Sequence, residues 1–497
     1  MDERADEEPA GRPRWVRRPP APALLVAAAA ALYSTYSLLQ LYTFKASTYD
    51  LVIFDQAIRS YSRFEMPRAM VKSVHNGFGS DFSILGDHFS PILALLAPFY
   101  WIHDGPATLL IAQAVLLALA IWPIWRYTRR KLGRTAAYGV SIGYMLSWPI
   151  AEALDFDFHE VAFVPLLTAL MVERHDAGKR GQAAAVAAIL LLVKEDMGLL
   201  LVGFGLYLLT RRGERRQGAG YIVAGLVATW LCSKVLITAF GGDDDYYWAY
   251  GSLGSNMSSA ARHALTHPWD VVTELLTPSI KVGTMALLVL PLLLLPLASP
   301  LTLTVLPLVA ERMLADRANW WEPRYHYNAF LIAVLLMAAV DGSVRLRRLL
   351  APQLAKARTR LPERLRTHLH PGMLTGVGIA TAAIITVPYF SFNALADPNL
   401  WRRNERARAA AAAAALVPDG ALVEAVNPIG PVLSTRARVL LWDRSPRNAP
   451  WVVADTRRIQ FPFWAVEEQR LRVKQLQAGG YQTLFARDGY LVLHRAD

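Results

Sequence analysis

The chain has 497 residues, of which 54% are hydrophobic and 19% are charged, with a formal net charge of +12. This composition is too apolar for an ordinary soluble protein, and its charges cluster between long apolar runs, as in membrane spans joined by loops. The basic residues lie in short loops where they set topology, so we expect no nucleic-acid partner, and the single cysteine, Cys232, excludes an intrachain disulfide.

Residues 1–20 are charged and rich in Pro and Arg, which predicts a disordered cytoplasmic tail. The next run, 21–43, is long enough to span and lacks a small-residue cleavage site, so we expect a retained first helix. Further clear spans are 106–127, 135–152, 219–240, 327–343 and 371–390. The positive-inside rule places five basic clusters in the cytoplasm. These clusters are Arg12–Arg18, Arg126–Arg134, Arg174–Arg180, Arg211–Arg216 and Arg345–Arg366.

Three stretches are ambiguous, and charge bias decides them. The run 89–102 is too short for a span of about 20 residues and is predicted to be a juxtamembrane helix near the outer surface. The run 181–210 carries Lys194 and its acidic neighbours at its centre, so two short spans with an external charged turn are favoured. The run 282–310 has four prolines and is predicted to be a hairpin of two passes.

With one further span between the external turn 153–159 and the cytoplasmic cluster Arg174–Arg180, these spans give a polytopic α-helical membrane protein of about 11 transmembrane helices, with a cytoplasmic N-terminus. Residues 21–390 form the transmembrane domain, which includes an external loop at 44–105. Residues 391–497 alternate helical and strand-like patterns, which predicts a small extracytoplasmic α/β domain. This domain has no glycine-rich phosphate-binding signature, so we assign it no nucleotide site. We expect a multi-pass protein of the plasma membrane.

Ionisable residues gather in the turns that this topology places outside. Charge in such turns is costly unless it lines a cavity, and sugar transfer from a lipid phosphate needs a carboxylate base and cations for the leaving group. The candidates are Asp50, Asp55, Asp87 and His88 in the first loop, Asp157, His159 and Glu160 in the second turn, Lys194, Glu195 and Asp196 in the third, and Arg324, Tyr325 and His326 in a later segment.

The same charged and aromatic residues also allow simpler, structural interpretations. Acidic loops such as Asp243–Asp245 are by default solvated surface, and Trp320 and Trp321 suit an interfacial aromatic belt. Asp50 or Asp55 could cap a helix. The Asp and His clusters could also hold a divalent cation, but no HExxH or comparable ligand spacing occurs, so the metal stays unknown and no cofactor is assigned.

Several motifs resemble a bacterial family of predicted membrane proteins known as a domain of unknown function. They are YDLVIFDQAIRS, GDHFSPILALLAPFYWI, DFHEVAFVPLL, LLLVKEDMGLLLVGFGLYLL and YHYNAFLIAVLL. The layout is also similar to GT-C glycosyltransferases, which use polyprenyl-phosphate sugars and begin with one helix and an external loop with an acidic motif. In that superfamily the motif is typically Asp-Glu; here Leu51 follows Asp50 and the second carboxylate is Asp55, which leaves open which aspartate is the base.

The resemblance implies an inverting sugar transfer from a polyprenyl-phosphate donor to an extracytoplasmic glycan, lipid or protein acceptor of the cell envelope. Asp50 is expected to be the base, with Asp55 as second choice, while Asp87 and His88 position the acceptor or an ion. Lys194 and Arg324 are expected to bind the donor phosphate. Two rivals are a transporter or flippase of lipid-linked envelope intermediates and a non-catalytic envelope-assembly scaffold.

Overall fold

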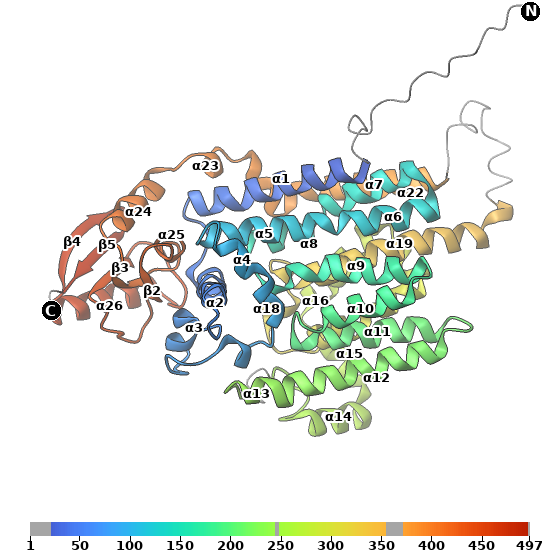
Figure 1. Cartoon of the computed structure of the whole chain (residues 1–497), viewed down its shortest axis with the longest axis horizontal. Coiled ribbons are helices and arrows are strands. Elements are labelled where there is room, and N and C mark those ends of the chain that lie inside the picture. Colours follow the sequence, from blue (N-terminus) through green and yellow to red (C-terminus); the bar gives the residue numbers. More distant parts are fainter. Residues whose placement is uncertain (1–20, 244–247, 354–370, 496–497) are drawn as a thin grey trace, which may run out of the picture.

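The structure, a computed structural model, describes residues 21–243, 248–353 and 371–495. The predicted tail 1–20, Asp244 and Asp245, and most of the last basic cluster lie outside the described residues. A body of near-parallel helices carries a small α/β domain at one end, which we call the site end (Figure 1). The predicted loop 44–105 lies between the two parts.

Five helical stretches in the described part of the chain are long and apolar enough to cross a membrane. A sixth candidate is bent by 71° between α15 (Pro268–Leu276) and α16 (Ser279–Val289). The five comprise α1 (Ala21–Tyr42), α5 with α6 (Pro106–Leu119 and Ile121–Leu132), α12 to α13 (Arg215–Leu231 and Ile237–Ala239), α19 (Ala329–Leu349) and α22 (Pro371–Thr386).

The remaining predicted spans consist of shorter helices, so the count of eleven stays a prediction. They are α7 (Arg134–Met145), α8 (Trp148–Asp155), α9 (Phe163–Asp176), α10 (Arg180–Leu190), α11 (Gly198–Leu209) and α17 (Leu306–Met313). Glycines allow some of them to approach a neighbour closely. A Cβ on Gly139 of α7 would lie 2.4 Å from the backbone of Gly376 in α22, and a Cβ on Gly205 of α11 would lie 2.5 Å from the Gly218 carbonyl oxygen of α12.

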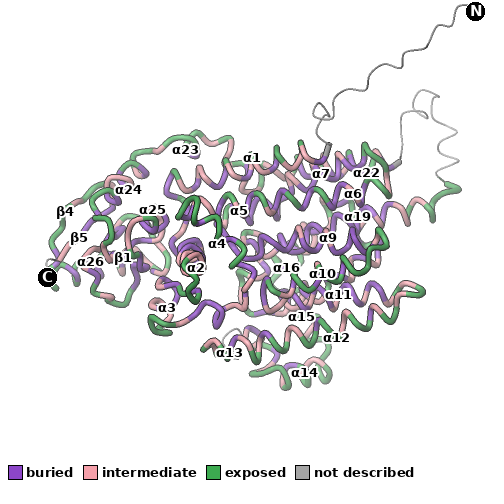
Figure 2. Tube along the Cα trace, viewed as in Figure 1, coloured by how far each residue is buried: buried purple, intermediate pink, exposed green. Residues whose placement is uncertain are grey.

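Burial distinguishes the centre of the helical body from its rim (Figure 2). In the most apolar window of the α19 stretch, 78% of residues are buried, whereas in the α12 stretch only 17% are. The outward side chains of α12 include exposed Val223, Leu226 and Trp230. An apolar surface of this kind suits contact with lipid tails.

The predicted hairpin at 282–310 is present in a distorted form. After α16 the chain continues as short 3-10 turns at Leu290–Leu292, Leu295–Ala298 and Pro300–Thr304, because prolines interrupt regular α-helix. The bend lies against the second half of α19, where the Ser299 hydroxyl donates to Asp341 at 2.7 Å. The segment therefore reaches from the site end to the opposite end and returns.

The basic clusters in the described residues meet at that opposite end (Figure 1). Arg130 and Lys131 pair with Asp176 at 3.2 and 2.6 Å, and Arg180 and Arg211 both pair with Glu214. A single orientation of the chain in the membrane therefore places all of these basic loops on the same side of the membrane, as the positive-inside rule requires. Which membrane face this is stays a prediction.

The C-terminal part forms a five-stranded sheet in the order β2-β1-β3-β5-β4. The first three strands in this order are parallel, and β5 and β4 are antiparallel neighbours. The strands are β1 (Leu422–Ala425), β2 (Arg438–Leu441), β3 (Trp451–Asp455), β4 (Gln482–Arg487) and β5 (Tyr490–His494), and the helices are α23 (Pro398–Trp401), α24 (Glu405–Ala415), α25 (Gly430–Leu433) and α26 (Val466–Ala478). The expected small α/β domain is confirmed.

The connections at the site end are short helices. The first loop contains α2 (Ile53–Ser62), α3 (Met70–His75), a 3-10 turn at Pro91–Leu96 and α4 (Ala97–Tyr100), and the later loops contain α14 (Met257–Thr266) and α18 (Ala318–Trp321). The broken 3-10 and α4 segment replaces a continuous helix over 89–102. Trp321 is buried, and its indole nitrogen donates to the Ala315 carbonyl at 3.0 Å, so it is packed inside and is no part of an exposed aromatic belt.

Candidate functional site

Asp50 occupies a strained turn at the entrance of the first loop. Its φ of 67° and ψ of −74° lie outside helical geometry, in a turn of π-helical hydrogen bonding that covers Thr48–Val52. A non-glycine residue in such a conformation persists only when its surroundings over-determine it, and such residues concentrate at functional sites. The Asp50 side chain keeps 27% of its surface exposed, so its carboxylate is open to a substrate.

Asp157 holds the chain just before this turn. Its carboxylate accepts hydrogen bonds from the Ser47 amide at 2.8 Å and from the Ser47 hydroxyl at 2.5 Å. Asp157 itself has a positive φ of 61°. Burial raises the pKa of Asp157 to about 7; the hydrogen bonds from Ser47 oppose this rise and the charge of Asp50 adds to it. Asp157 is therefore a support for the Asp50 turn that titrates near neutral pH.

Two stacked histidines lie beside Asp50. The rings of His159 and His326 are 3.9 Å apart between centroids, and His159 Nε2 lies 3.8 Å from Asp50 Oδ1. Phe156 stacks on His159 at 5.2 Å, and Tyr325 meets Phe156 edge-on at 4.9 Å. The second turn and the segment before α19 thus supply one wall of aromatic rings next to the carboxylate.

Lys194 brings a cation into the same region. Its ammonium group lies 3.2 Å from Glu160, whose side chain is only 1% exposed. Burial alone would lower the pKa of Lys194, but the carboxylates of Glu160, Glu195 and Asp196 raise it above its ordinary value. Lys194 is therefore a permanent cation near neutral pH.

The phenol of Tyr327 is influenced by the charges of both Lys194 and Asp50. The Tyr327 hydroxyl interacts electrostatically with Lys194, Asp50, Arg312 and Glu160. Arg312, near the end of α17, is buried, its guanidinium lies 4.0 Å from the centre of the Phe330 ring, and it donates to the Tyr327 carbonyl. The sequence analysis missed Arg312, although the adjacent charges of Glu311 and Arg312 at the end of an apolar run were a visible signal.

The first loop contributes two further ion pairs. His88 Nδ1 lies 2.7 Å from Glu195, and Lys72 lies 3.0 Å from Asp87. Burial alone would lower the pKa of His88 and so would the charge of Lys194, but Glu195 and Asp87 raise it above its ordinary value. The predicted Asp87 and His88 are thus brought to the third turn, within the same charged network as Lys194.

Arg324 and Asp55 lie in other surroundings. Arg324 is exposed, and its charge acts on Glu152 in α8, a carboxylate that accepts from the Ser391 amide at 2.8 Å. Asp55 is fully buried in α2, where Arg59 pairs with it at 2.9 Å and the Tyr100 hydroxyl donates to it at 2.7 Å. These partners enclose the Asp55 carboxylate, which argues for a structural role in fixing α4 to α2.

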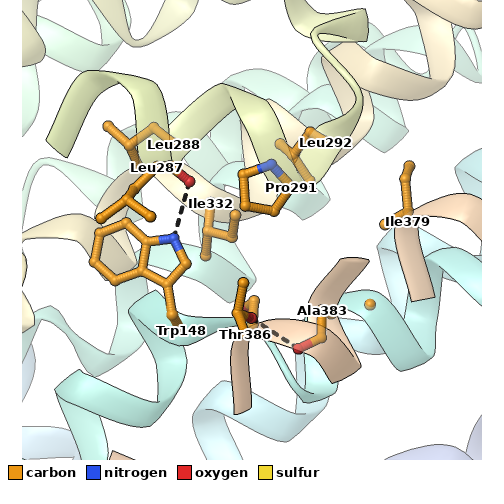
Figure 3. A pocket seen from close by; sticks show the side chains of 11 residues that line it. Trp148, Leu287, Leu288, Pro291, Leu292, Ile332, Ile379, Ala383 and Thr386 are labelled. Atoms are coloured by element: carbon orange, nitrogen blue, oxygen red, sulfur yellow. Dashed lines mark hydrogen bonds between the residues drawn. The ribbon is translucent and has the colours of Figure 1, made fainter. Parts of the chain in front are cut away.

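The described residues, with their gaps at 244–247 and 354–370, contain no group of three His, Cys, Asp or Glu side chains that could hold a metal ion. A narrow crevice does open between α8, α16, α19 and α22 (Figure 3). Trp148 and Leu287 line it, with the Trp148 indole nitrogen donating to the Leu287 carbonyl at 3.0 Å. Its free volume is about 10 Å³, which holds at most one water molecule and no lipid tail.

Comparisons with known proteins agree with this architecture. The profile of a family described as "Predicted membrane protein (DUF2079)" matches residues 40–492. No curated protein matches the chain by sequence. The crystal structure of ArnT from Cupriavidus metallidurans bound to undecaprenyl phosphate is similar over 95% of this chain and 97% of its own, with a TM-score of 0.53 and 12% identity.

Two structures from Archaeoglobus fulgidus also match, each over 96% of this chain and 74% of its own, with a TM-score of 0.42. One is an oligosaccharyltransferase tethered with an acceptor peptide, at 12% identity. The other is the oligosaccharyltransferase AglB in complex with an inhibitory peptide and a dolichol-phosphate, at 11% identity. At these identities the likeness to ArnT establishes the GT-C fold alone, and it confirms the fold class expected from the sequence.

Proposed function

We propose that this chain, which belongs to the DUF2079 family of predicted membrane proteins, is a membrane glycosyltransferase. It would move a sugar from a polyprenyl-phosphate donor to an acceptor hydroxyl on the outer side of the plasma membrane. The observation that carries this proposal is the half-open carboxylate of Asp50, held in a strained turn beside the stacked rings of His159 and His326. The charges of Asp50 and of the buried cation Lys194 both act on Tyr327, the residue that follows His326.

Asp50 acts as the general base. Its carboxylate takes the proton from the acceptor hydroxyl while the acceptor oxygen forms a bond to the anomeric carbon of the sugar. The bond between that carbon and the phosphate oxygen breaks on the opposite side, and its electron pair leaves with the polyprenyl phosphate. The sugar is therefore transferred with inversion.

Lys194 stabilises the negative charge that grows on the leaving phosphate. Arg312 adds positive potential from the other side of Tyr327. The exposed Arg324, two residues before His326, is placed to meet the phosphate of an entering donor.

The rings of Phe156, His159 and Tyr325 suit the apolar face of a sugar. On the acceptor side, Tyr49 lies next to Asp50 and contacts Phe461 of the α/β domain at 4.9 Å between ring centroids. Phe461 is 47% exposed, so this ring pair offers a surface to an acceptor. The ion pairs of Asp87 with Lys72 and of His88 with Glu195 stabilise the first loop.

A direct test compares Asp50→Asn with Asp81→Asn, a matched control in the same loop whose side chain is 85% exposed. Purified proteins are given a panel of short-chain polyprenyl-phosphate hexoses and pentoses with envelope glycan acceptors. We expect the wild type and Asp81→Asn to release polyprenyl phosphate from at least one donor, and Asp50→Asn to be slower by a factor of about 10² or more.

The same proteins in vesicles separate the enzyme from the flippase alternative. Sugar transfer without translocation of the donor supports the enzyme. Translocation of an intact donor, with transfer rates equal in Asp50→Asn and wild type, would remove Asp50 from the chemistry and favour a transporter.

A further inference from the structure

The α/β domain touches the chain immediately before the strained Asp50. The contact comes from Asn427, in the turn between β1 and α25. The amide and hydroxyl of Thr48 donate to the Asn427 carbonyl at 2.7 and 2.6 Å. The amide of Tyr49 donates to the Asn427 side-chain oxygen at 3.0 Å. One residue of the terminal domain therefore accepts three hydrogen bonds from the two residues that precede Asp50.

The approach of these two segments is close enough to require a glycine. A Cβ added to Gly430 would lie 2.1 Å from the Thr48 hydroxyl oxygen, and Thr48 is completely buried. A second contact lies further along the first loop, where the Gln56 amide nitrogen donates to the Val439 carbonyl of β2 at 2.9 Å. The domain is thus seated on the loop through buried polar contacts with defined geometry.

The conformation of Asp50 needs such support. Backbone angles of this kind are sparsely populated and persist only where neighbouring contacts determine them. From the transmembrane part, Asp157 accepts hydrogen bonds from the amide and hydroxyl of Ser47. From the terminal domain, Asn427 accepts hydrogen bonds from the amides of the next two residues, Thr48 and Tyr49. The transmembrane part and the terminal domain each supply one anchor of the turn.

We propose that Asn427 is a positioning residue for sugar transfer, so that the base is in place only while the terminal domain is docked on the first loop. This inference rests on the proposed function of Asp50. The α/β domain is then part of the active site, because it fixes the orientation of the Asp50 carboxylate without touching the reacting atoms.

Two variants at this position separate positioning from general stability. Asn427→Ala removes the side-chain acceptor of the Tyr49 amide and leaves the backbone carbonyl in place. Asn427→Asp keeps an acceptor oxygen of the same reach. Asn399→Ala is the matched control, because Asn399 is exposed on α23 and donates to the Asp397 carboxylate through its amide and its side chain.

The first readout is hydrogen exchange of the peptide that contains the Tyr49 amide, measured on the full chain in detergent. We expect about fivefold faster exchange of that peptide in Asn427→Ala, because one hydrogen bond is lost, and wild-type exchange in Asn427→Asp and Asn399→Ala. The second readout is kcat against the donor KM. We expect kcat to fall between about 10-fold and 100-fold in Asn427→Ala with an unchanged donor KM, since a small misplacement of the base affects only the chemical step. Asn427→Asp should recover most of kcat.

Wild-type exchange in Asn427→Ala would overturn the proposal, and so would faster exchange with an unchanged kcat. A loss of kcat in Asn427→Asp equal to that in Asn427→Ala, with normal exchange, would also overturn it. If the wild type transfers sugar from no donor in the panel, the proposed function fails and the positioning proposal, which rests on it, is overturned with it. Exchange then reports only whether Asn427 anchors the turn, so the two failures are distinguishable.

Discussion

Removing the Lys194 ammonium group should damage stability and activity through two separable causes. In Lys194→Met, Glu160 stays 1% exposed and loses the one cation that pairs with it among the described residues. Breaking a buried ion pair by deleting one partner costs about 3–5 kcal/mol, whereas replacing both partners by apolar residues of similar volume is often neutral. The free energy of unfolding should therefore fall by about 3–5 kcal/mol in Lys194→Met.

The double variant Glu160→Met with Lys194→Met provides the discriminating comparison. We expect its stability to return to within about 1–2 kcal/mol of the wild type, because Glu160 no longer lies buried without its cation and Glu195 keeps its pair with His88. Its transfer rate should stay low, because the leaving phosphate still lacks its cation. Unfolding is followed by denaturant titration of the purified protein, and transfer by release of polyprenyl phosphate. A double variant that regains both stability and transfer would show that Lys194 acts only through Glu160 and would refute a role at the phosphate.

Two other variants test neighbouring parts of the site. Burial raises the pKa of Asp157 from 3.8 to about 7, so the folded state binds an extra proton between these values and stability falls as pH rises from about 4 to 7. In Asp157→Asn this fall in Tm should be absent, while an amide oxygen still accepts from Ser47; an unchanged pH slope would contradict the assignment. Phe461→Ala should raise the acceptor KM about three- to tenfold and leave the donor KM unchanged, since an aromatic contact is worth about 0.5–1.5 kcal/mol beyond its buried area. Equal changes in both constants would show that Phe461 does not belong to an acceptor surface.

The sequence predicts which turns lie at the same end of the helical body, because the basic clusters determine which connections are cytoplasmic. When all the basic clusters lie on one side, the first loop, the turn at Asp157 and the turn at Lys194 must lie together on the other side. There the structure places Asp50 beside His159 and Lys194 beside Glu160, and the charges of Asp50 and Lys194 both act on Tyr327. The breaks in the helices near Lys194 and in the proline-rich hairpin were also predictable, since buried charge and missing amide donors interrupt spans.

The orientation of individual side chains was not predictable. Asp50 and Asp55 are both loop aspartates, and only the folded chain shows that Arg59 and Tyr100 enclose the second of them. Glu152 of α8 is bonded to Ser391, a residue 239 positions away, and only the folded chain shows this contact. These partners are set by tertiary packing and leave no periodic signal in the sequence.

The contact of Asn427 with Tyr49 spans 378 positions and had no local signal. An alternating pattern can predict the strands of the α/β domain, but a single sequence cannot predict where the domain docks. The strain at Asp50 was equally hidden, because nothing in the residues around it requires a positive φ. Functional sites are where local preference is most often overridden.

We predict that a lipid phosphate binds beside Lys194, within reach of Asp50. Cryo-electron microscopy of Asp50→Asn with undecaprenyl phosphate is the direct test. We expect phosphate density in hydrogen-bonding contact with Lys194 at the site end, with the prenyl chain leaving between helices. Phosphate density at the opposite end, beside Asp341 and Arg345, would contradict it.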